Sequence, residues 1–135
     1  MDLKYLFVCI YLAVDILYVV LSKPFYNKAI QNIQGFPMKM KKYTSLSAAI
    51  SYLIMGIGWI TIVANRVTSS TSYEETFYIA LMYGLAIFGV FNTTLYVMFE
   101  KWDLLTAIRD TCWGTGWILT ISFLYLYTLK SFTRQ

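Results

Sequence analysis

Hydrophobic residues are grouped in four long stretches of the chain, and polar residues are concentrated between them. The stretches cover residues 3–21, 45–64, 77–98 and 105–129. A helix rises ~1.5 Å per residue and needs about 20 apolar residues to cross a hydrocarbon core of ~30 Å, a length that each stretch approaches or exceeds. The pattern therefore predicts an all-α polytopic membrane protein: one domain, residues 1–135, with four transmembrane helices in an antiparallel bundle with short loops.

The first segment between these stretches, residues 22–44, is basic and contains no acidic residue. It carries five lysines: Lys23, Lys28, Lys39, Lys41 and Lys42. Its first half predicts a short separate helix at the membrane surface, with Ser22 as N-cap, Pro24 in the first turn and Gly35 as the end. The alternative is a plain solvated loop. In either case the lysines are candidates for contact with the membrane surface or with a partner.

The two other loops are shorter. Ser72 followed by Glu75 forms a capping box, which predicts the start of the third helix. Residues 99–104 are few enough to predict a tight hairpin between the third and fourth helices. Lysine and arginine are more frequent in the first and third loops than on the other side, which favours a cytoplasmic location for these two loops.

Composition supports the membrane class and narrows the functions. Hydrophobic residues make up 59% of the chain and charged residues 13%, whereas soluble domains have about 45–50% and about 25%. The net charge of +4 lies mostly in the first loop, which favours the membrane surface or a protein partner over nucleic acid. The chain has no histidine, and its two cysteines fall in different predicted spans, so neither a metal site nor a cofactor is expected.

Polar side chains inside the predicted spans fall at one level of the bilayer. Counting the helical rise places four of them there: Asp15, Ser51, Asn92 and Asp110. Such residues are costly in lipid, so they face the protein interior and serve packing or function. Two interpretations stay open: hydrogen bonds that fix the register of the helices, or a carboxylate pair, Asp15 and Asp110, that binds a cation or relays protons.

The second half of the chain carries a spaced motif. Its residues are Trp102, Thr106, Asp110, Trp113, Gly114 and Thr115, preceded by Gly84 and the run 91–94. This pattern resembles the DUF2177 family of small four-helix integral membrane proteins, which has bacterial and large-DNA-virus members. The resemblance implies a fold and a membrane location, and no agreed biochemical activity. The family's aspartate in the third helix is Asn92 here, so a site of three acids would lack one charge, which favours a structural role.

These observations predict a non-enzymatic structural protein of a membrane. The chain is rich in tyrosine, isoleucine and lysine and poor in alanine and arginine, unlike the bacterial members of the family, which favours the viral branch. That places it in the internal membrane of a large DNA virus particle, with the basic loop against the capsid, a scaffold protein or a second copy. The alternative is a small ion or solute transporter that uses Asp15 and Asp110.

Overall fold

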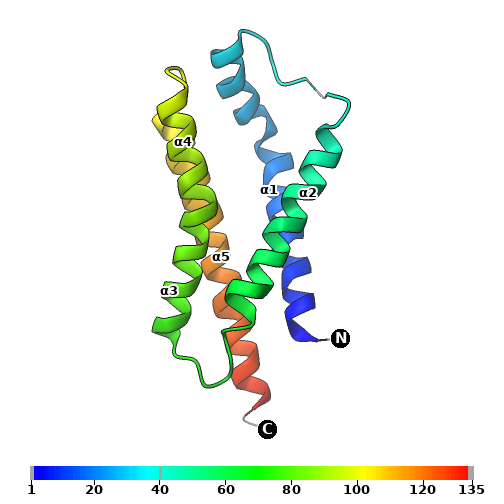
Figure 1. The fold of residues 1–135 in the computed structure, drawn as a ribbon, viewed down its shortest axis with the longest axis vertical. Coiled ribbons are helices and arrows are strands. Elements are labelled where there is room, and N and C mark those ends of the chain that lie inside the picture. The colour runs from blue at the N-terminus through cyan, green and yellow to red at the C-terminus, as the bar shows by residue number, and fades with distance from the viewer. Residues whose placement is uncertain (1, 40, 134–135) are drawn as a thin grey trace.

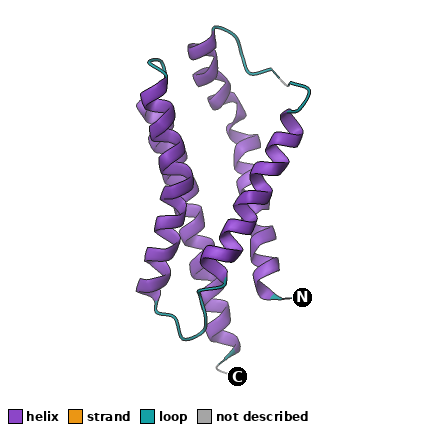
Figure 2. Cartoon of the chain, viewed as in Figure 1, coloured by secondary structure: helices purple, strands orange, loops and turns teal. Residues whose placement is uncertain are grey.

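The computed structural model describes residues 2–39 and 41–133, and all regular structure in these residues is helical (Figure 2). The elements are α1 (Leu3–Gln34), α2 (Thr44–Gly58) with the π-helical η1 (Trp59–Ala64), α3 (Tyr73–Gly84) with the π-helical η2 (Leu85–Gly89) and α4 (Val90–Met98), and α5 (Leu104–Phe132). They form four rods: α1, α2–η1, α3–η2–α4 and α5. This confirms the predicted all-α class for the described residues.

Successive rods run in opposite directions (Figure 1). Both chain ends therefore lie at one end of the molecule, here called the terminal end, together with the loop of residues 65–72. The loops of residues 35–43 and 99–103 lie at the opposite end, here called the loop end.

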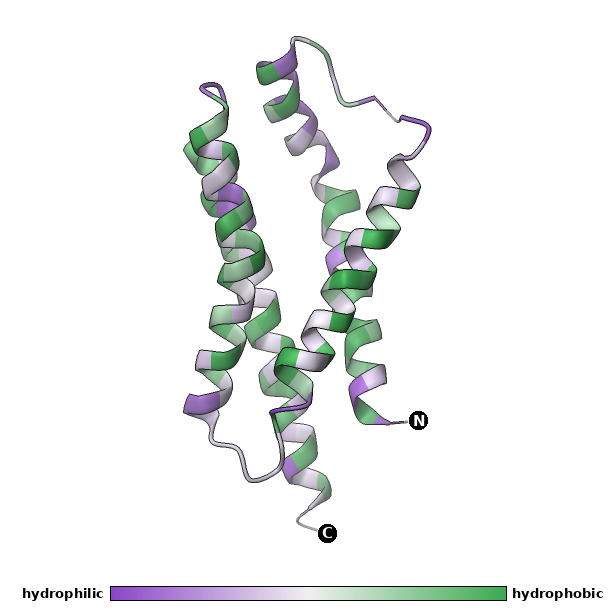
Figure 3. Ribbon diagram, in the orientation of Figure 1, coloured by the Kyte–Doolittle hydropathy of each residue, from purple (hydrophilic) through white to green (hydrophobic). Residues whose placement is uncertain are grey.

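Three rods have the length and hydropathy needed to cross a membrane: Leu3–Gln34, Thr44–Ala64 and Tyr73–Met98. Figure 3 shows hydrophobic residues along the middle of these rods and hydrophilic residues mainly towards the ends and loops. The fourth rod, α5, is 29 residues long. Its threonine, glycine, tryptophan and tyrosine residues lower its hydropathy, and it is not one of these three spans. The fourth predicted span therefore stays a prediction.

The first helix is longer than predicted. A separate surface helix beginning at Ser22 is wrong, because α1 continues through Pro24 to Gln34. Pro24 has no N–H to donate to the carbonyl of Val20, a loss that a long helix tolerates when neighbouring packing holds it. Gly35 ends the helix as predicted: its φ of 82° is left-handed, and its N–H donates to the Gln31 carbonyl at 2.9 Å. The basic loop is thus residues 35–43, shorter than the predicted 22–44.

Side-chain caps begin the two later rods. The Ser72 side chain accepts a hydrogen bond from the Glu75 N–H at 3.0 Å, which confirms Ser72 as the cap of α3. Asp103 caps α5 by accepting from the Thr106 N–H at 2.9 Å, and the Thr106 hydroxyl also donates to this carboxylate. The bond from the Thr106 side chain is the main cause that holds the pKa of Asp103 below its ordinary value.

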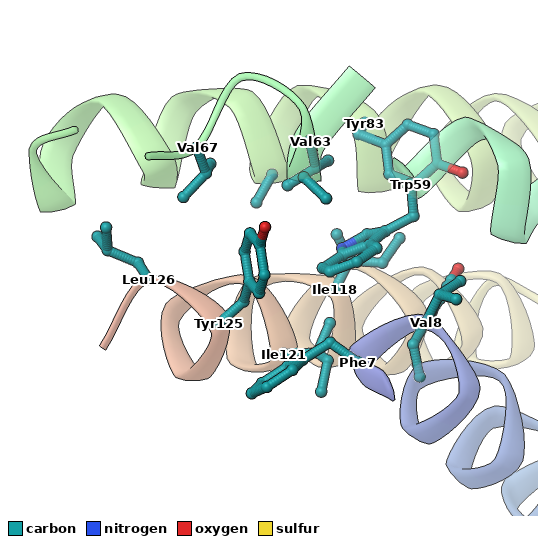
Figure 4. Packing of buried hydrophobic residues seen from close by; sticks show 13 residues of the cluster. Phe7, Val8, Trp59, Val63, Val67, Tyr83, Ile118, Ile121, Tyr125 and Leu126 are labelled. Carbon is teal, nitrogen blue, oxygen red and sulfur yellow. The ribbon is translucent and has the colours of Figure 1, made fainter. Parts of the chain in front are cut away.

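The hydrophobic core lies at the terminal end, where all four rods meet (Figure 4). At its centre Trp59 is fully buried, its ring 5.5 Å from that of Tyr125, and its indole N–H donates to Ser122 Oγ at 3.2 Å. The core residues are Phe7, Val8, Tyr11, Trp59, Val63, Ala64, Val67, Ala80, Tyr83, Ile118, Ile121, Tyr125 and Leu126. None of them belongs to the loop-end half of the bundle, so that half is held by other contacts.

The second rod contacts its neighbours closely at two glycines and then diverges from α4. A side chain on Gly58 would meet the Tyr83 hydroxyl at 2.5 Å, and without one Tyr83 donates to the Met55 carbonyl at 2.6 Å. A side chain on Gly56 would lie 3.2 Å from Leu12. Gly56 is the one buried residue of α2, and the loop-end half of this helix leans away from α4 (Figure 1).

Candidate functional site

Asp110 joins three helices at the loop end of the bundle. The Tyr26 hydroxyl of α1 donates to Asp110 Oδ1, and Asn92 Nδ2 of α4 donates to Asp110 Oδ2 at 2.6 Å. Asn92 is 1% exposed, and the same amide nitrogen also donates to the Phe88 carbonyl at 2.9 Å. Both carboxylate oxygens of Asp110 thus have protein donors, which is the arrangement that makes a buried polar group a stable interhelical contact.

Asp15 is buried on α1 without a basic partner. Its side chain is 4% exposed, and no lysine or arginine among the described residues forms an ion pair with it. The Trp113 indole N–H and the Tyr52 hydroxyl lie beside the carboxylate as donors. Within the described residues, the Trp113 N–H does not complete a hydrogen bond of normal geometry. The Asp15 carboxylate therefore has weaker hydrogen bonding than the Asp110 carboxylate. A positively charged ligand could bind beside it and compensate its buried charge.

The two aspartates line one cleft of about 630 Å³ between the second rod, the third rod and α1. Its other polar wall residue is Ser51, whose hydroxyl donates to the Ser47 carbonyl at 3.0 Å. Four aromatic side chains also line the cleft, together with aliphatic residues: Tyr52, Tyr83, Phe88 and Phe91. This volume lies within the range of ~300–1,000 Å³ typical of small-molecule sites, and an apolar wall with few polar groups is also typical of them.

The structure thus brings three of the four predicted polar residues to this cleft, and the fourth, Asn92, contacts it through Asp110. Within the described residues, no group of three or more histidine, cysteine, aspartate or glutamate side chains is placed to hold a metal ion.

Both central rods widen from α to π geometry next to the cleft. The segment η1 contributes Ile62 to its wall, and η2 contributes Ile87 and Phe88. The Phe88 carbonyl accepts the side chains of Asn92, as above, and of Thr111 at 3.3 Å. Single π turns within α-helices are frequent at functional sites, where they redirect side chains. Nothing in the hydrophobic pattern indicated these two segments.

The motif residues of α5 pack against the other helices. Trp102 is buried in the turn before α5, and Thr106 forms the cap contact with Asp103. The Trp113 ring stacks on Tyr18 with 4.1 Å between centroids. The ring of Phe88 covers Gly114, and Thr115 lies against Gly84. Each motif position except Asp110 therefore has a packing or capping contact that accounts for its residue type.

The five candidate lysines divide into two groups. Lys23 and Lys28 are exposed on α1, and Lys39, Lys41 and Lys42 are exposed in the loop of residues 35–43. Two of the loop lysines lie over neighbouring aromatic rings, Lys39 over Phe36 and Lys42 over Tyr43. None of the five is in an ion pair among the described residues, so their charge is available at the loop end.

Tyr26 is the site residue that the sequence interpretation missed. The sequence places it in the predicted surface segment of residues 22–44, whereas in the structure its hydroxyl donates to Asp110 Oδ1. One signal was present: Tyr26 follows Asp15 by 11 residues, about three helical turns, which puts both on one face of a continuous helix. The hydrophobic pattern ended the first helix at residue 21, so it did not place Asp15 and Tyr26 on the same helix, whereas α1 continues through Pro24.

Replacing Tyr26 with phenylalanine is expected to destabilise the protein by about 0.5–1.5 kcal/mol, because Asp110 loses one of its two donors. Thermal unfolding in detergent, followed by circular dichroism, measures the change. The matched control is Y43F, because Tyr43 is 61% exposed and its hydroxyl has no described hydrogen bond. Equal unfolding curves for the two variants would show that the Tyr26 contact contributes nothing.

The fold and the site define a membrane protein with three long apolar helices. Of the four predicted polar residues, Asp15 and Asn92 are buried, Asp110 is half-buried and Ser51 is exposed. The chain belongs to the DUF2177 family, described as a predicted membrane protein, whose family model matches residues 3–127. Comparison with curated proteins and with solved structures finds no match. The resemblance seen in the spaced motif is thereby confirmed. The family description gives a membrane location and names no biochemical activity.

Proposed function

We propose that all four rods cross the bilayer, as a four-span antiparallel bundle. The support for α5 as the fourth span is its length of 29 residues, about 43 Å of helix. It packs against each of the other three rods, so much of its surface contacts protein instead of lipid. A helix in that position needs fewer apolar residues than a helix surrounded by lipid.

The four-span topology predicts that the two termini lie on one side of the membrane and residues 35–43 on the other. Single cysteines introduced at Asp2, Ser131 and Phe36, with Cys9 and Cys112 replaced by alanine, measure this in sealed vesicles. A membrane-impermeant maleimide is expected to label the two terminal positions from the same side and Phe36 from the opposite side. Labelling of the termini from opposite sides would exclude a fourth span.

We propose further that the protein is a non-enzymatic binding protein of the transport class, whose cleft takes a small organic cation beside Asp15. The observation that carries this proposal is the Asp15 carboxylate, which is buried in the wall of the 630 Å³ cleft without a basic partner among the described residues. Charge attraction in a medium of low dielectric favours a cation there.

The wall of the cleft favours an organic ammonium over a metal ion. Aromatic faces attract ammonium groups, and four aromatic side chains line the cleft with the aspartates. Hard metal ions such as Ca²⁺ prefer a shell of six to eight oxygen atoms, which this mostly apolar wall does not provide. The proposed ligand is therefore a small ammonium compound with an apolar substituent.

Binding of benzyltrimethylammonium to the full chain in nanodiscs tests the proposal. The matched ligand is neopentylbenzene, which has the same shape without the charge. We expect saturable binding of the ammonium compound by isothermal titration calorimetry and much weaker binding of the neutral one. Equal binding would show an apolar cleft that lipid chains fill, and would overturn the proposal. Uptake of the labelled cation into proteoliposomes then tests transport.

The second candidate is a structural component of a membrane, including the internal membrane of a large DNA virus particle. The observation that favours it is the positive charge of Lys39, Lys41 and Lys42 at the loop end, which no ion pair among the described residues neutralises and which suits an acidic protein surface. Lysine cross-linking with mass spectrometry on native membranes or particles tests it. Links from these lysines to a coat or scaffold protein would support the structural role, and links only between copies of the chain would remove it.

A further inference from the structure

A second cleft, of about 380 Å³, lies at the loop end between α1 and the turn that joins α4 to α5. α1 packs on α2 and α5 but not on α4, so this side of the bundle is open between α1 and α4. Val19, Phe91 and Asp110 line this cleft and the one described above. The second cleft therefore adjoins the first but has different chemistry.

The polar part of this cleft offers positive charge and an unused hydrogen-bond donor. Lys23 lines it, exposed and without an ion pair among the described residues. Trp102 also lines it, and this side chain is 8% exposed, with an indole N–H that has no partner in the described part of the chain. A buried donor without a partner is rare in native proteins and indicates a ligand or water that is bound there.

A second cation lies at the same level. The Arg109 guanidinium is 4.3 Å from the centre of the Phe25 ring, on the helices that carry Asp110 and Tyr26. Asp110 is the one acid in the cleft wall, and both of its oxygens already accept hydrogen bonds from Tyr26 and Asn92. The balance of free charge in this part of the cleft is therefore positive, which suits an anion.

On the side of Lys23 away from the loops, the cleft is apolar. On α1 the wall continues from Lys23 to Val20 and Val19, about 5–6 Å further along the helix. Phe91 of α4 faces the same space. Polar contacts near the membrane surface and apolar contacts below them match the shape of a phospholipid.

We propose that this cleft binds one anionic phospholipid, with its phosphate at Lys23 and Trp102 and one acyl chain along Val19, Val20 and Phe91. The lysine supplies the charge and the indole N–H supplies a directional hydrogen bond to a phosphate oxygen. The loop lysines Lys39, Lys41 and Lys42 lie at the same end of the molecule and raise the local concentration of anionic lipid.

Native mass spectrometry of the full chain in detergent tests the proposal, with phosphatidylglycerol and phosphatidylcholine of identical acyl chains as probes. We expect one bound phosphatidylglycerol to survive at concentrations where phosphatidylcholine does not. The variant K23Q is expected to weaken retention of phosphatidylglycerol about fivefold. The matched control is K28Q, which removes the same charge from the same helix but does not line the cleft, and it is expected to retain the lipid as the wild type does.

Three results would overturn the proposal. Equal retention of the two lipids by the wild type would remove the preference for an anion. Equal losses in K23Q and K28Q would show a general attraction to the lysines and no defined site. Displacement of the lipid by soluble glycerol 3-phosphate would show a site for a free phosphate compound. Because Lys23 is exposed, K23Q leaves the packing intact, and W102F then tests the hydrogen bond separately.

Discussion

Replacing Asp15 with asparagine is expected to weaken binding of benzyltrimethylammonium at least about 30-fold. Removal of one partner of a buried charge pair costs about 2 kcal/mol or more. Asp110 already accepts hydrogen bonds from Tyr26 and Asn92, whereas Asp15 has only the nearby Trp113 and Tyr52 groups as donors. The substitution keeps the shape of the side chain and its place beside Trp113 and Tyr52. Isothermal titration calorimetry in nanodiscs measures the affinity.

The control for this variant is S51A, because Ser51 lines the same cleft without charge. Thermal stability gives a second, independent readout. A buried carboxylate without a basic partner is a cost to folding, so D15N is expected to unfold at the same temperature as the wild type or higher. A clear loss of stability in D15N with unchanged ammonium binding would assign Asp15 to the structure of the bundle and not to a ligand.

Replacing Gly84 with alanine is expected to destabilise the bundle by about 1–3 kcal/mol, the range for inserting a methyl group into tight packing. The new Cβ would lie 2.9 Å from the Cα of Thr115. That atom belongs to the backbone of α5, so α3 and α5 would have to separate. Unfolding by heat in detergent, followed by circular dichroism, measures the loss.

The matched control is G116A on α5. A Cβ at Gly116 would have nothing within 4 Å, and alanine favours the helix more than glycine does, so this variant is expected to be as stable as the wild type or more stable. If G84A and G116A unfold alike, the close contact between α3 and α5 does not exist in the membrane protein.

Asparagine, and not aspartate, at position 92 has a physical explanation in the structure. The Asn92 amide donates to Asp110 at 2.6 Å. An ionised aspartate at this position would place two carboxylates in contact, which is tolerated only if they share a proton. Asparagine removes that requirement and supplies a permanent donor. Asparagine at position 92 therefore suits the proposed site, in which Asp110 fixes the helices and Asp15 faces the ligand.

The sequence predicted the helices of this fold better than the positions at which one helix ends and the next segment begins. Four apolar stretches became four rods, and Ser72 and Gly35 marked a start and an end because caps depend on local hydrogen bonds and on φ. The continuity of α1 through Pro24 was not predictable, because it depends on tertiary contacts such as the one between Tyr26 and Asp110. Local propensity at Pro24 favoured a break, and packing prevailed.

The candidate site was predictable as a set of residues but not as an arrangement. Helical rise alone placed Asp15, Ser51, Asn92 and Asp110 at one depth. It could not show that Asp110 would be fully hydrogen-bonded while Asp15 would lack a basic partner, since that distinction depends on the rotation of each helix. The π segments η1 and η2 shift that rotation, and no hydropathy pattern reports them.

The close contacts at Gly56 and Gly58 hold α2 at one end, so a change in the tilt of its loop-end half would pivot about these two glycines. The pivot is the point where these two glycines meet Leu12 and Tyr83. Thr44, the first residue of α2, is 12 residues before Gly56 and thus about 18 Å from the pivot. A rotation of roughly 10° about this pivot would displace Thr44 by about 3 Å. Ser51 and Tyr52 lie on this half of α2 and line the cleft that contains Asp15. The tilt of this half therefore determines the width of the cleft.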